Sequence, residues 1–204
     1  MDQALLEQFQ QAYQDLDLFP LIEPEDIAKF RVDYGLHILV RLKQEINASI
    51  KNGKFVFAGH RGCGKSTLLK RLSIEMQNKH AVVFFSIADL IEMSDITHVN
   101  ILYAIALKLL SRATKQQISV SDDIKETLLG WNTTVRKQLQ QDQTQSGVGL
   151  GGELQMFTLK LQQEKSFRDQ LETTFAKKIS DLVGKIDRLA AAIQTAVKQP
   201  VLET

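Results

Sequence analysis

The sequence has little of what marks secreted or membrane proteins. Its single cysteine, Cys63, cannot form an internal disulfide, which is typical of a reducing compartment. No apolar run reaches the roughly 18 to 20 residues that a membrane-spanning helix needs. Residues 1–7 are acidic and lack the basic start and apolar stretch of a signal peptide. We therefore expect a cytoplasmic protein.

The sequence also has few prolines, and it has no excess of charge of one sign. The prolines are Pro20, Pro24 and Pro200, so nothing between the last two forbids long helices and helix should dominate. Lys and Arg total 25 and Asp and Glu total 24, a balance that gives no long-range attraction to nucleic acid or to an anionic membrane. Neither is indicated as a partner. With 44% hydrophobic residues, the chain can bury a globular core.

Apolar periodicity predicts a helix-rich α/β protein. Side chains that recur at three- and four-residue steps indicate helices over 3–17, 36–50, 66–77, 124–139 and 166–197. A further helix, which Asp95 would cap, is apolar nearly all round over 99–113, as in a helix sandwiched between other elements. The short apolar runs 55–58 and 81–87 suit buried strands of a parallel sheet, and 153–162 is another strand candidate. This order of elements is typical of an α/β layered fold.

The strongest local signal is a complete phosphate-binding motif. Residues 59–66 read Gly-His-Arg-Gly-Cys-Gly-Lys-Ser and match G-x-x-x-x-G-K-[ST]. The glycines at 59, 62 and 64 allow left-handed turns and a close approach of phosphates. The N–H groups of such a loop form a concave nest for an anion, and the helix that follows adds its positive end. The sequence therefore predicts binding of ATP with Mg²⁺.

Each position of the motif has an expected role. Lys65, the catalytic residue of the motif, places its ammonium against the β- and γ-phosphates, and Ser66 offers its hydroxyl to Mg²⁺. Thr67 can contact the α-phosphate. The predicted nucleotide site comprises Gly59, His60, Arg61, Gly62, Cys63, Gly64, Lys65, Ser66 and Thr67.

The free positions of the motif leave alternatives open. Arg61 either adds charge near the γ-phosphate or is a solvated residue, and Cys63 is either a reactive thiol or a small loop residue. The alternative for the whole motif is a glycine-rich turn with a surface lysine. Hydrolysis would need a carboxylate at the end of a second core strand. Asp89, after 81–87, is the candidate, and capping a short turn is its other interpretation.

Beyond the motif, the chain resembles a known family. Residues 55–67 are similar to the P-loop region of bacterial AAA/STAND-type ATPases, and 83–90 and 101–110 resemble the second strand and helix of that group. Trp131 and Arg168 also fit its pattern. The resemblance implies an N-terminal helical segment over 1–52 and a P-loop NTPase core over 53–204, a parallel sheet with flanking helices.

The resemblance also bears on activity. In this family a strand that ends in paired acidic residues, the Walker B element, follows a long helix. Residues 200–202 resemble the first step of that strand, and the sequence ends at Thr204. The resemblance therefore implies an incomplete, truncated ATPase module with weak or absent hydrolysis, whose nucleotide state switches an assembly with a protein partner or with other copies of itself.

Two other classes of function compete with this interpretation. The first is a complete small NTPase or kinase in which Asp89 serves as the Mg²⁺ carboxylate. The second is a non-enzymatic interaction protein whose helices over 3–17 and 166–197 pair with other chains.

Overall fold

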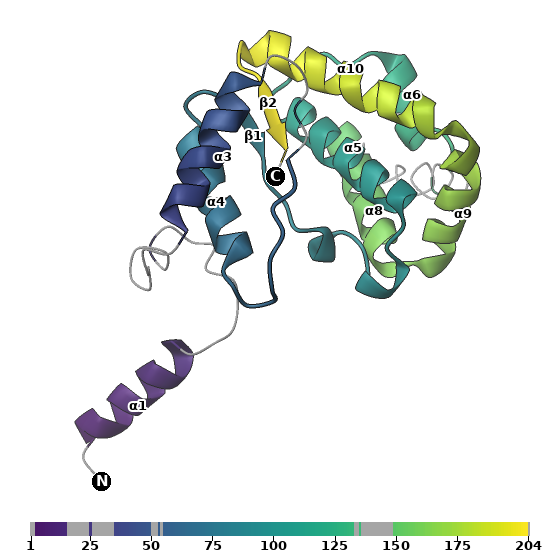
Figure 1. Cartoon of the computed structure of the whole chain (residues 1–204). Helices are drawn as coiled ribbons and strands as arrows, with labels where there is room; N and C mark the ends of the chain where they lie inside the picture. The colour runs from purple at the N-terminus through teal and green to yellow at the C-terminus, as the bar shows by residue number, and fades with distance from the viewer. Residues whose placement is uncertain are drawn as a thin grey trace. The chain divides into compact units, whose positions relative to one another are not determined.

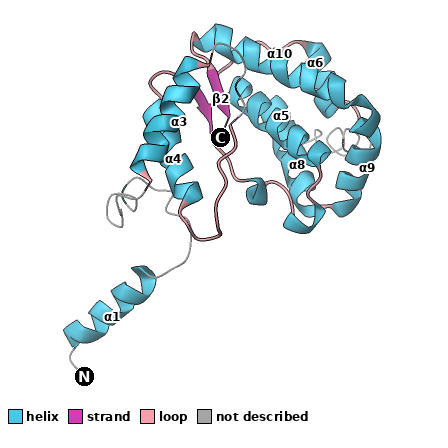
Figure 2. Cartoon of the chain, in the orientation of Figure 1, coloured by secondary structure: helices cyan, strands magenta, loops and turns pink. Residues whose placement is uncertain are grey.

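The computed structural model describes residues 3–15, 25, 35–49, 53, 55–132, 135 and 149–203. The chain is mostly helical, with a two-stranded parallel sheet in the described part (Figures 1 and 2). Contacts along the chain divide it into two compact units, 1–76 and 77–204, each of which is described by itself. The domain boundary expected between residues 52 and 53 stays a prediction.

The first unit contains the predicted helices near its start, in slightly shorter form. They are α1 (Gln3–Asp15), α3 (Leu36–Ala48) and α4 (Lys65–Met76). Helices α3 and α4 pack against each other, and each has two buried apolar residues: Leu39 and Ile46 in α3, Leu72 and Met76 in α4. An ion pair between Lys43 of α3 and Glu75 of α4 joins the same two helices.

The prediction of a strand over 55–58 is wrong. Residues 55–60 have no strand pairing, and the Val56 side chain is 93% exposed. Four apolar residues carry no period of their own, and β-propensity acts through packing against neighbouring strands. Without a paired neighbour among the described residues, the run enters the glycine-rich loop as an irregular segment.

The second unit is built around one central helix. Helix α5 (His98–Lys115) contacts α6 (Asp122–Leu129), α8 (Leu150–Gln163), α9 (Lys165–Phe175) and α10 (Ile179–Val197). This confirms the helix expected over 99–113 and its sandwiched position (Figure 1). The helix predicted over 124–139 is confirmed as α6 in its first half, whereas most of residues 133–148 lie outside the described residues.

An aromatic cluster fills the middle of this unit. Trp131 lies 5.1 to 6.3 Å, centroid to centroid, from the rings of Tyr103, Phe157, Phe167 and Phe175. Its Nε1 donates a hydrogen bond to Tyr103 Oη at 3.1 Å, and Tyr103 Oη donates to the Leu128 carbonyl at 2.5 Å. Burial raises the pKa of Tyr103, so the phenol stays a neutral donor. The indole N–H of Trp131 and the hydroxyl of Tyr103 therefore both have hydrogen-bond partners inside the core.

The sheet joins two segments far apart in the sequence. Strand β1 (Ala81–Val83) pairs in parallel with β2 (Val201–Glu203), in the register Ala81↔Val201. The strand predicted over 81–87 is confirmed for its first three residues only, because the chain enters a 3₁₀ turn, η1 (Ile87–Asp89), soon afterwards. The apolar start of a strand expected at 201–202 is β2.

Two other sequence predictions are wrong. Residues 153–162 form the helix α8 rather than a strand, because Leu154, Phe157 and Leu161 recur at helical steps and are all buried. The single helix expected over 166–197 is divided by a 3₁₀ turn, η3 (Ala176–Lys178), into α9 and α10.

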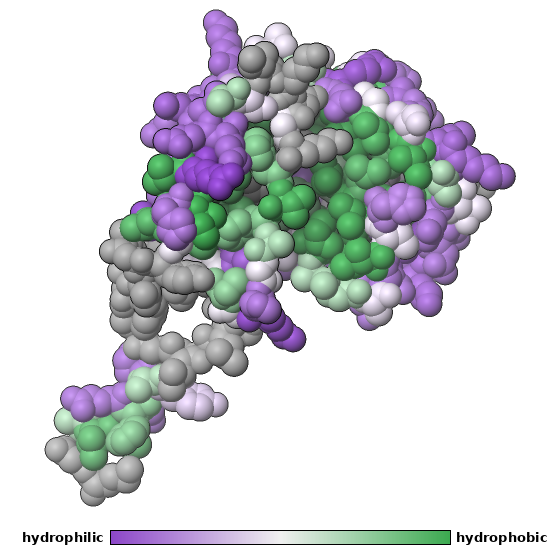
Figure 3. Space-filling model, viewed as in Figure 1, coloured by the Kyte–Doolittle hydropathy of each residue, from purple (hydrophilic) through white to green (hydrophobic). Residues whose placement is uncertain are grey.

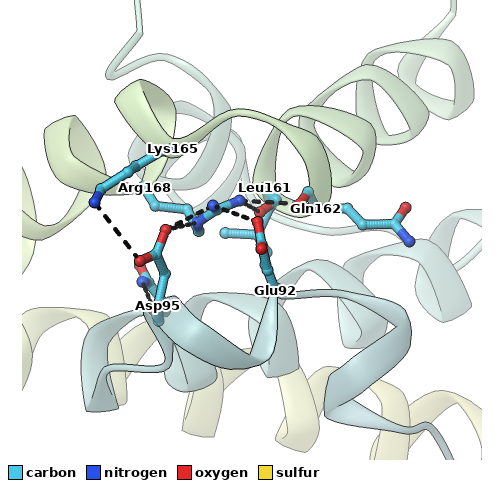
Figure 4. A network of polar contacts seen from close by, with 7 residues as sticks. Glu92, Asp95, Leu161, Gln162, Lys165 and Arg168 are labelled. Atoms are coloured by element: carbon cyan, nitrogen blue, oxygen red, sulfur yellow. Dashed lines mark hydrogen bonds and ion pairs between the residues drawn. The ribbon is translucent and has the colours of Figure 1, made fainter.

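Asp95 does not cap the following helix. The cap of α5 is Thr97, whose side chain accepts the N–H of Asn100 at 3.3 Å. Asp95, at the end of the 3₁₀ turn η2 (Met93–Asp95), instead faces Arg168 of α9 (Figure 4).

The Arg168 guanidinium connects the turn η2 to the end of α8 by hydrogen bonds. The residue is 2% exposed, and its Nη2 and Nε lie 2.7 and 3.2 Å from Asp95 Oδ2. Its Nη1 donates to the carbonyls of Leu161 and Gln162 at 3.0 and 2.9 Å, at the end of α8. The hydrogen bonds from Arg168 hold the pKa of the Asp95 carboxyl below its usual value of 3.8, with smaller help from the charge of Lys165. The connection before α5 is therefore fixed to the α8–α9 corner.

Replacement of Arg168 by alanine should destabilise the second unit on the order of 3 kcal/mol. The change removes several charge-assisted hydrogen bonds and leaves two carbonyls and Asp95 without their buried donor. Urea unfolding followed by Trp131 fluorescence measures the loss. Arg188→Ala is the matched control, since that side chain is 55% exposed where it pairs with Asp123, and it should cost much less. Equal losses in the two variants would contradict the role given to Arg168.

The same network predicts a dependence of stability on acid. Because the folded pKa of Asp95 is lowered, its contribution is complete above the unfolded value near 3.8 and is lost as the pH falls through the folded value. Asp95→Asn should therefore lose less of its stability than the unchanged chain as the pH falls from about 6 through 3.8, the unfolded value of Asp95. Urea midpoints across this range measure the difference. Asp122→Asn, at a carboxylate that is 98% exposed, should keep the original pH profile.

Candidate functional site

The glycine-rich loop has the left-handed backbone that its sequence predicts at two of its three glycines. Gly62 and Gly64 have φ values of +81° and +75°, in the left-handed region that favours glycine. The N–H of Cys63 donates to the His60 carbonyl at 3.4 Å, and Leu68 N–H donates to the Gly64 carbonyl at 2.9 Å. The chain thus reverses twice within the loop and passes directly into α4.

Gly59 differs from the other two glycines, because side chains of the loop lie close to it. A Cβ atom added there would lie 3.0 Å from Cys63 Sγ and 3.6 Å from Lys65 Cδ. At Gly62 and Gly64 a Cβ would meet nothing within 4 Å, so their requirement comes from φ alone. The first glycine of the motif leaves room inside the loop, and the other two set its turns.

The Lys65 side chain folds back across the loop. Its Nζ donates to the carbonyls of Gly59 and His60 at 2.8 and 2.6 Å, and it lies 3.8 Å from Cys63 Sγ. An ammonium has three donor hydrogens, and a thiol is a weak acceptor. Two donors are therefore well used by the loop, and the third faces a poor partner that an incoming anion can replace.

The first turn of α4 adds further donors beside this ammonium. The opening N–H groups of a helix have no partner within it, and they carry the positive end of the helix dipole. The turn contains no acidic residue that would offset this charge. Ser66 in this turn is exposed, and Thr67 is half-buried. The Lys65 ammonium and the first-turn N–H groups of α4 therefore lie at the same end of this helix.

The structure brings most of the predicted site residues together. Gly59, His60, Cys63 and Lys65 are in mutual contact, and Ser66 and Thr67 follow Lys65 on the helix. Arg61 and Gly62 are exposed on the loop. Arg61 has no charged partner in the ion pairs of the described residues, so its role stays as open as the sequence left it.

Asp89 belongs to the other unit. It lies in η1 directly after β1, is exposed, and its N–H donates to the Ser86 carbonyl at 3.2 Å. Its roles as a metal carboxylate or as a cap both stay predictions.

The residues of the loop fit Mg²⁺ held together with a nucleotide. Mg²⁺ prefers oxygen ligands and usually combines a few protein oxygens with phosphates and water. The exposed Ser66 hydroxyl offers such an oxygen. The described residues contain no cluster of three or more His, Cys, Asp or Glu side chains, so no separate all-protein metal site competes with it there.

No protein-family model, curated protein or solved structure matches this chain. The resemblance to AAA/STAND-type ATPases therefore rests on the sequence residues that carry it. No helix in the described ranges has the length and apolar character to cross a membrane.

The φ values predict opposite effects for one substitution at two glycines. Gly64→Ala should cost about 1 kcal/mol, because alanine is strained at φ +75° although its methyl group meets nothing. Gly184→Ala, within α10 and with nothing within 4 Å, should stabilise the chain by up to about 1 kcal/mol. Thermal unfolding followed by far-UV circular dichroism measures both. The same sign of change at the two positions would contradict the loop conformation.

Proposed function

We propose that the chain binds ATP with Mg²⁺ at Gly59–Thr67, as the P-loop module of an AAA/STAND-type ATPase. One observation carries the proposal: the Lys65 ammonium lies across a loop whose two turns depend on glycines of positive φ, at the N-terminus of a helix. A glycine-rich turn with a surface lysine would leave the ammonium in solvent instead.

The binding chemistry follows from the donors of the loop. Phosphate oxygens accept from backbone N–H groups and from the first turn of α4, where the dipole favours negative charge. Lys65 exchanges bonds to neutral carbonyls for bonds to the negatively charged oxygens of the β- and γ-phosphates, in which both partners are ionised. Ser66 contributes its hydroxyl to Mg²⁺, and Thr67 reaches the α-phosphate. Bound Mg²⁺ supplies charge neutralisation of the phosphates.

The parallel sheet supports a fold of the P-loop NTPase type. Strands β1 and β2 are parallel, and the helices α5 to α10 lie between them in the sequence. Parallel strands joined through helices are typical of α/β proteins. We place the pair in a P-loop NTPase-like sheet with flanking helices.

Hydrolysis is the weaker part of the function. Turnover requires a carboxylate that positions Mg²⁺ and the attacking water. The described contacts of residues 59–67 include no carboxylate partner. We therefore propose nucleotide binding with weak or absent hydrolysis, in which Lys65 acts first as a binding residue.

Isothermal titration calorimetry with ATP and Mg²⁺ tests the binding. Lys65→Ala should weaken the affinity about 10- to 100-fold, since a hydrogen bond to a charged group contributes about 1.5 to 3 kcal/mol. Lys115→Ala removes the same charge from an exposed position at the end of α5 and should leave the affinity unchanged. A folded chain without affinity for ATP or GTP, or equal losses in both variants, would refute the proposal.

A turnover assay on the same samples separates the enzymatic alternative. Phosphate release that Asp89→Ala abolishes, while ATP binding persists, would favour a complete NTPase or kinase over a binding module. Binding without release, unchanged by Asp89→Ala, is the expected result.

A further inference from the structure

The start of helix α3 has a backbone that helix starts seldom have. Gly35 precedes the helix with a φ of +73° and a ψ of 12°, in the left-handed region, whereas the residue before a helix is typically extended. Gly35 is buried, and its carbonyl accepts from the N–H groups of Ile38 and Leu39 at 3.0 and 3.2 Å. A residue with a side chain would be strained at this φ. The path of the chain at Gly35 is therefore set by something other than helix capping.

The Leu68 side chain of α4 accounts for this path. A Cβ atom added to Gly35 would lie 3.1 Å from Leu68 Cδ1, closer than the roughly 3.5 to 4.0 Å at which carbon atoms pack best. The Gly35 backbone therefore lies against Leu68. Because the side chains of a helix lean toward its N-terminus, Leu68 covers the turn that precedes it. That turn begins at Lys65 and contains Ser66 and Thr67.

Helices α3 and α4 run in the same direction, so the start of α3 lies beside the first turn of α4. Gly35 meets Leu68 near the start of both helices, and Lys43 pairs with Glu75 about two turns farther along. Figure 1 shows the two helices side by side, with their starts at the same end. Figure 3 shows polar side chains gathered over these two helices, where the ion pair lies. Of the two contacts, the apolar one at Gly35 is next to the phosphate loop.

We propose that Gly35 is a positioning residue of the phosphate site, which holds the first turn of α4 in place through Leu68. This role rests on the proposed binding of nucleotide at Gly59–Thr67. Gly35 acts through Leu68 and needs no contact with the nucleotide. The Leu68 N–H donates to the Gly64 carbonyl at 2.9 Å, so the residue that Gly35 supports is the one that joins the loop to the helix.

The distances explain why a side chain at position 35 would affect binding. The groups of a binding site have to be held within about 0.5 Å of their productive positions. A Cβ at Gly35 displaces Leu68 by a few tenths of an ångström, which is comparable to that tolerance. The N–H groups of the first turn and the Ser66 hydroxyl then no longer all meet the phosphates and Mg²⁺ together.

Gly35→Asn tests this contact, because asparagine tolerates a left-handed backbone and adds a side chain against Leu68. In isothermal titration calorimetry with ATP and Mg²⁺, the variant should bind about 3- to 10-fold more weakly than the unchanged chain. Leu68→Ala removes the atoms that the new side chain would meet. In the Leu68→Ala background, Gly35→Asn should therefore have almost no further effect on the dissociation constant.

Ile46→Val is the matched control, since Ile46 is buried near the other end of α3. It should lower the melting temperature, measured by far-UV circular dichroism, and leave the dissociation constant for ATP unchanged. If Gly35→Asn gives this same pattern, Gly35 supports stability alone and the positioning role is wrong. A loss of affinity that is equal with and without the Leu68 side chain would also overturn it, because the contact would then not be the cause.

Hydrogen exchange of the unchanged chain gives a second measurement that needs no variant. If the first turn of α4 and the start of α3 are coupled, linkage requires bound ATP to stabilise the α3 start in return. The amides of Ile38 and Leu39, which donate to the Gly35 carbonyl, should then exchange at least about threefold more slowly with ATP, relative to the Ile46 amide. Equal ratios with and without saturating ATP would contradict the coupling.

A failure of this role differs from a failure of nucleotide binding. If the unchanged, folded chain does not bind ATP, the proposed function is refuted and the positioning role with it. If the unchanged chain binds ATP and Gly35→Asn binds it equally well, nucleotide binding stands and the positioning role alone is refuted.

Discussion

The position of the Lys65 ammonium is the constraint on which the glycine-rich loop depends. Its bonds to the carbonyls of Gly59 and His60 are possible because the chain reverses at Gly62 and Gly64, where φ is positive. A side chain at either position would strain that path, and one at Gly59 would meet Cys63. The loop is thus specified by three glycines: Gly62 and Gly64 allow its left-handed turns, and the side chains of Cys63 and Lys65 lie beside Gly59.

A second cation has the corresponding role in the other unit, with the opposite accessibility. Arg168 is buried and has its donors engaged by Asp95 and by two carbonyls, so little of its charge is available to a ligand. Lys65 is only half-buried, and its third donor faces a weak acceptor. The two cations therefore have different roles. Arg168 holds together two segments 73 residues apart in the sequence, and Lys65 is able to exchange its hydrogen-bond partners.

The sequence predicts what is local and periodic. The helices α1, α3, α4 and α5 appear within two residues of their expected bounds, and two of the three motif glycines, Gly62 and Gly64, have positive φ. Two strand predictions are wrong for different reasons. The four apolar residues 55–58 find no paired neighbour strand among the described residues, and the partial alternation of 153–162 is outweighed by the helical steps of Leu154, Phe157 and Leu161. Asp95 was expected to act locally, whereas its partner is remote. One signal was available: Arg168 lies seven residues from both Leu161 and Phe175, on an otherwise buried helical stripe, where an unpaired charge would be costly.

Nucleotide binding at the loop, as proposed, and assembly with a partner are separate events that can be measured separately. The proposed phosphate binding uses backbone donors and one charge, whereas assembly would use surface elsewhere on the chain. Two such events are independent unless the chain couples them. If nucleotide changes the dissociation constant of an assembly by some factor, thermodynamic linkage requires assembly to change nucleotide affinity by the same factor. A switch of the AAA/STAND type therefore requires that coupling, and nucleotide binding alone does not establish it.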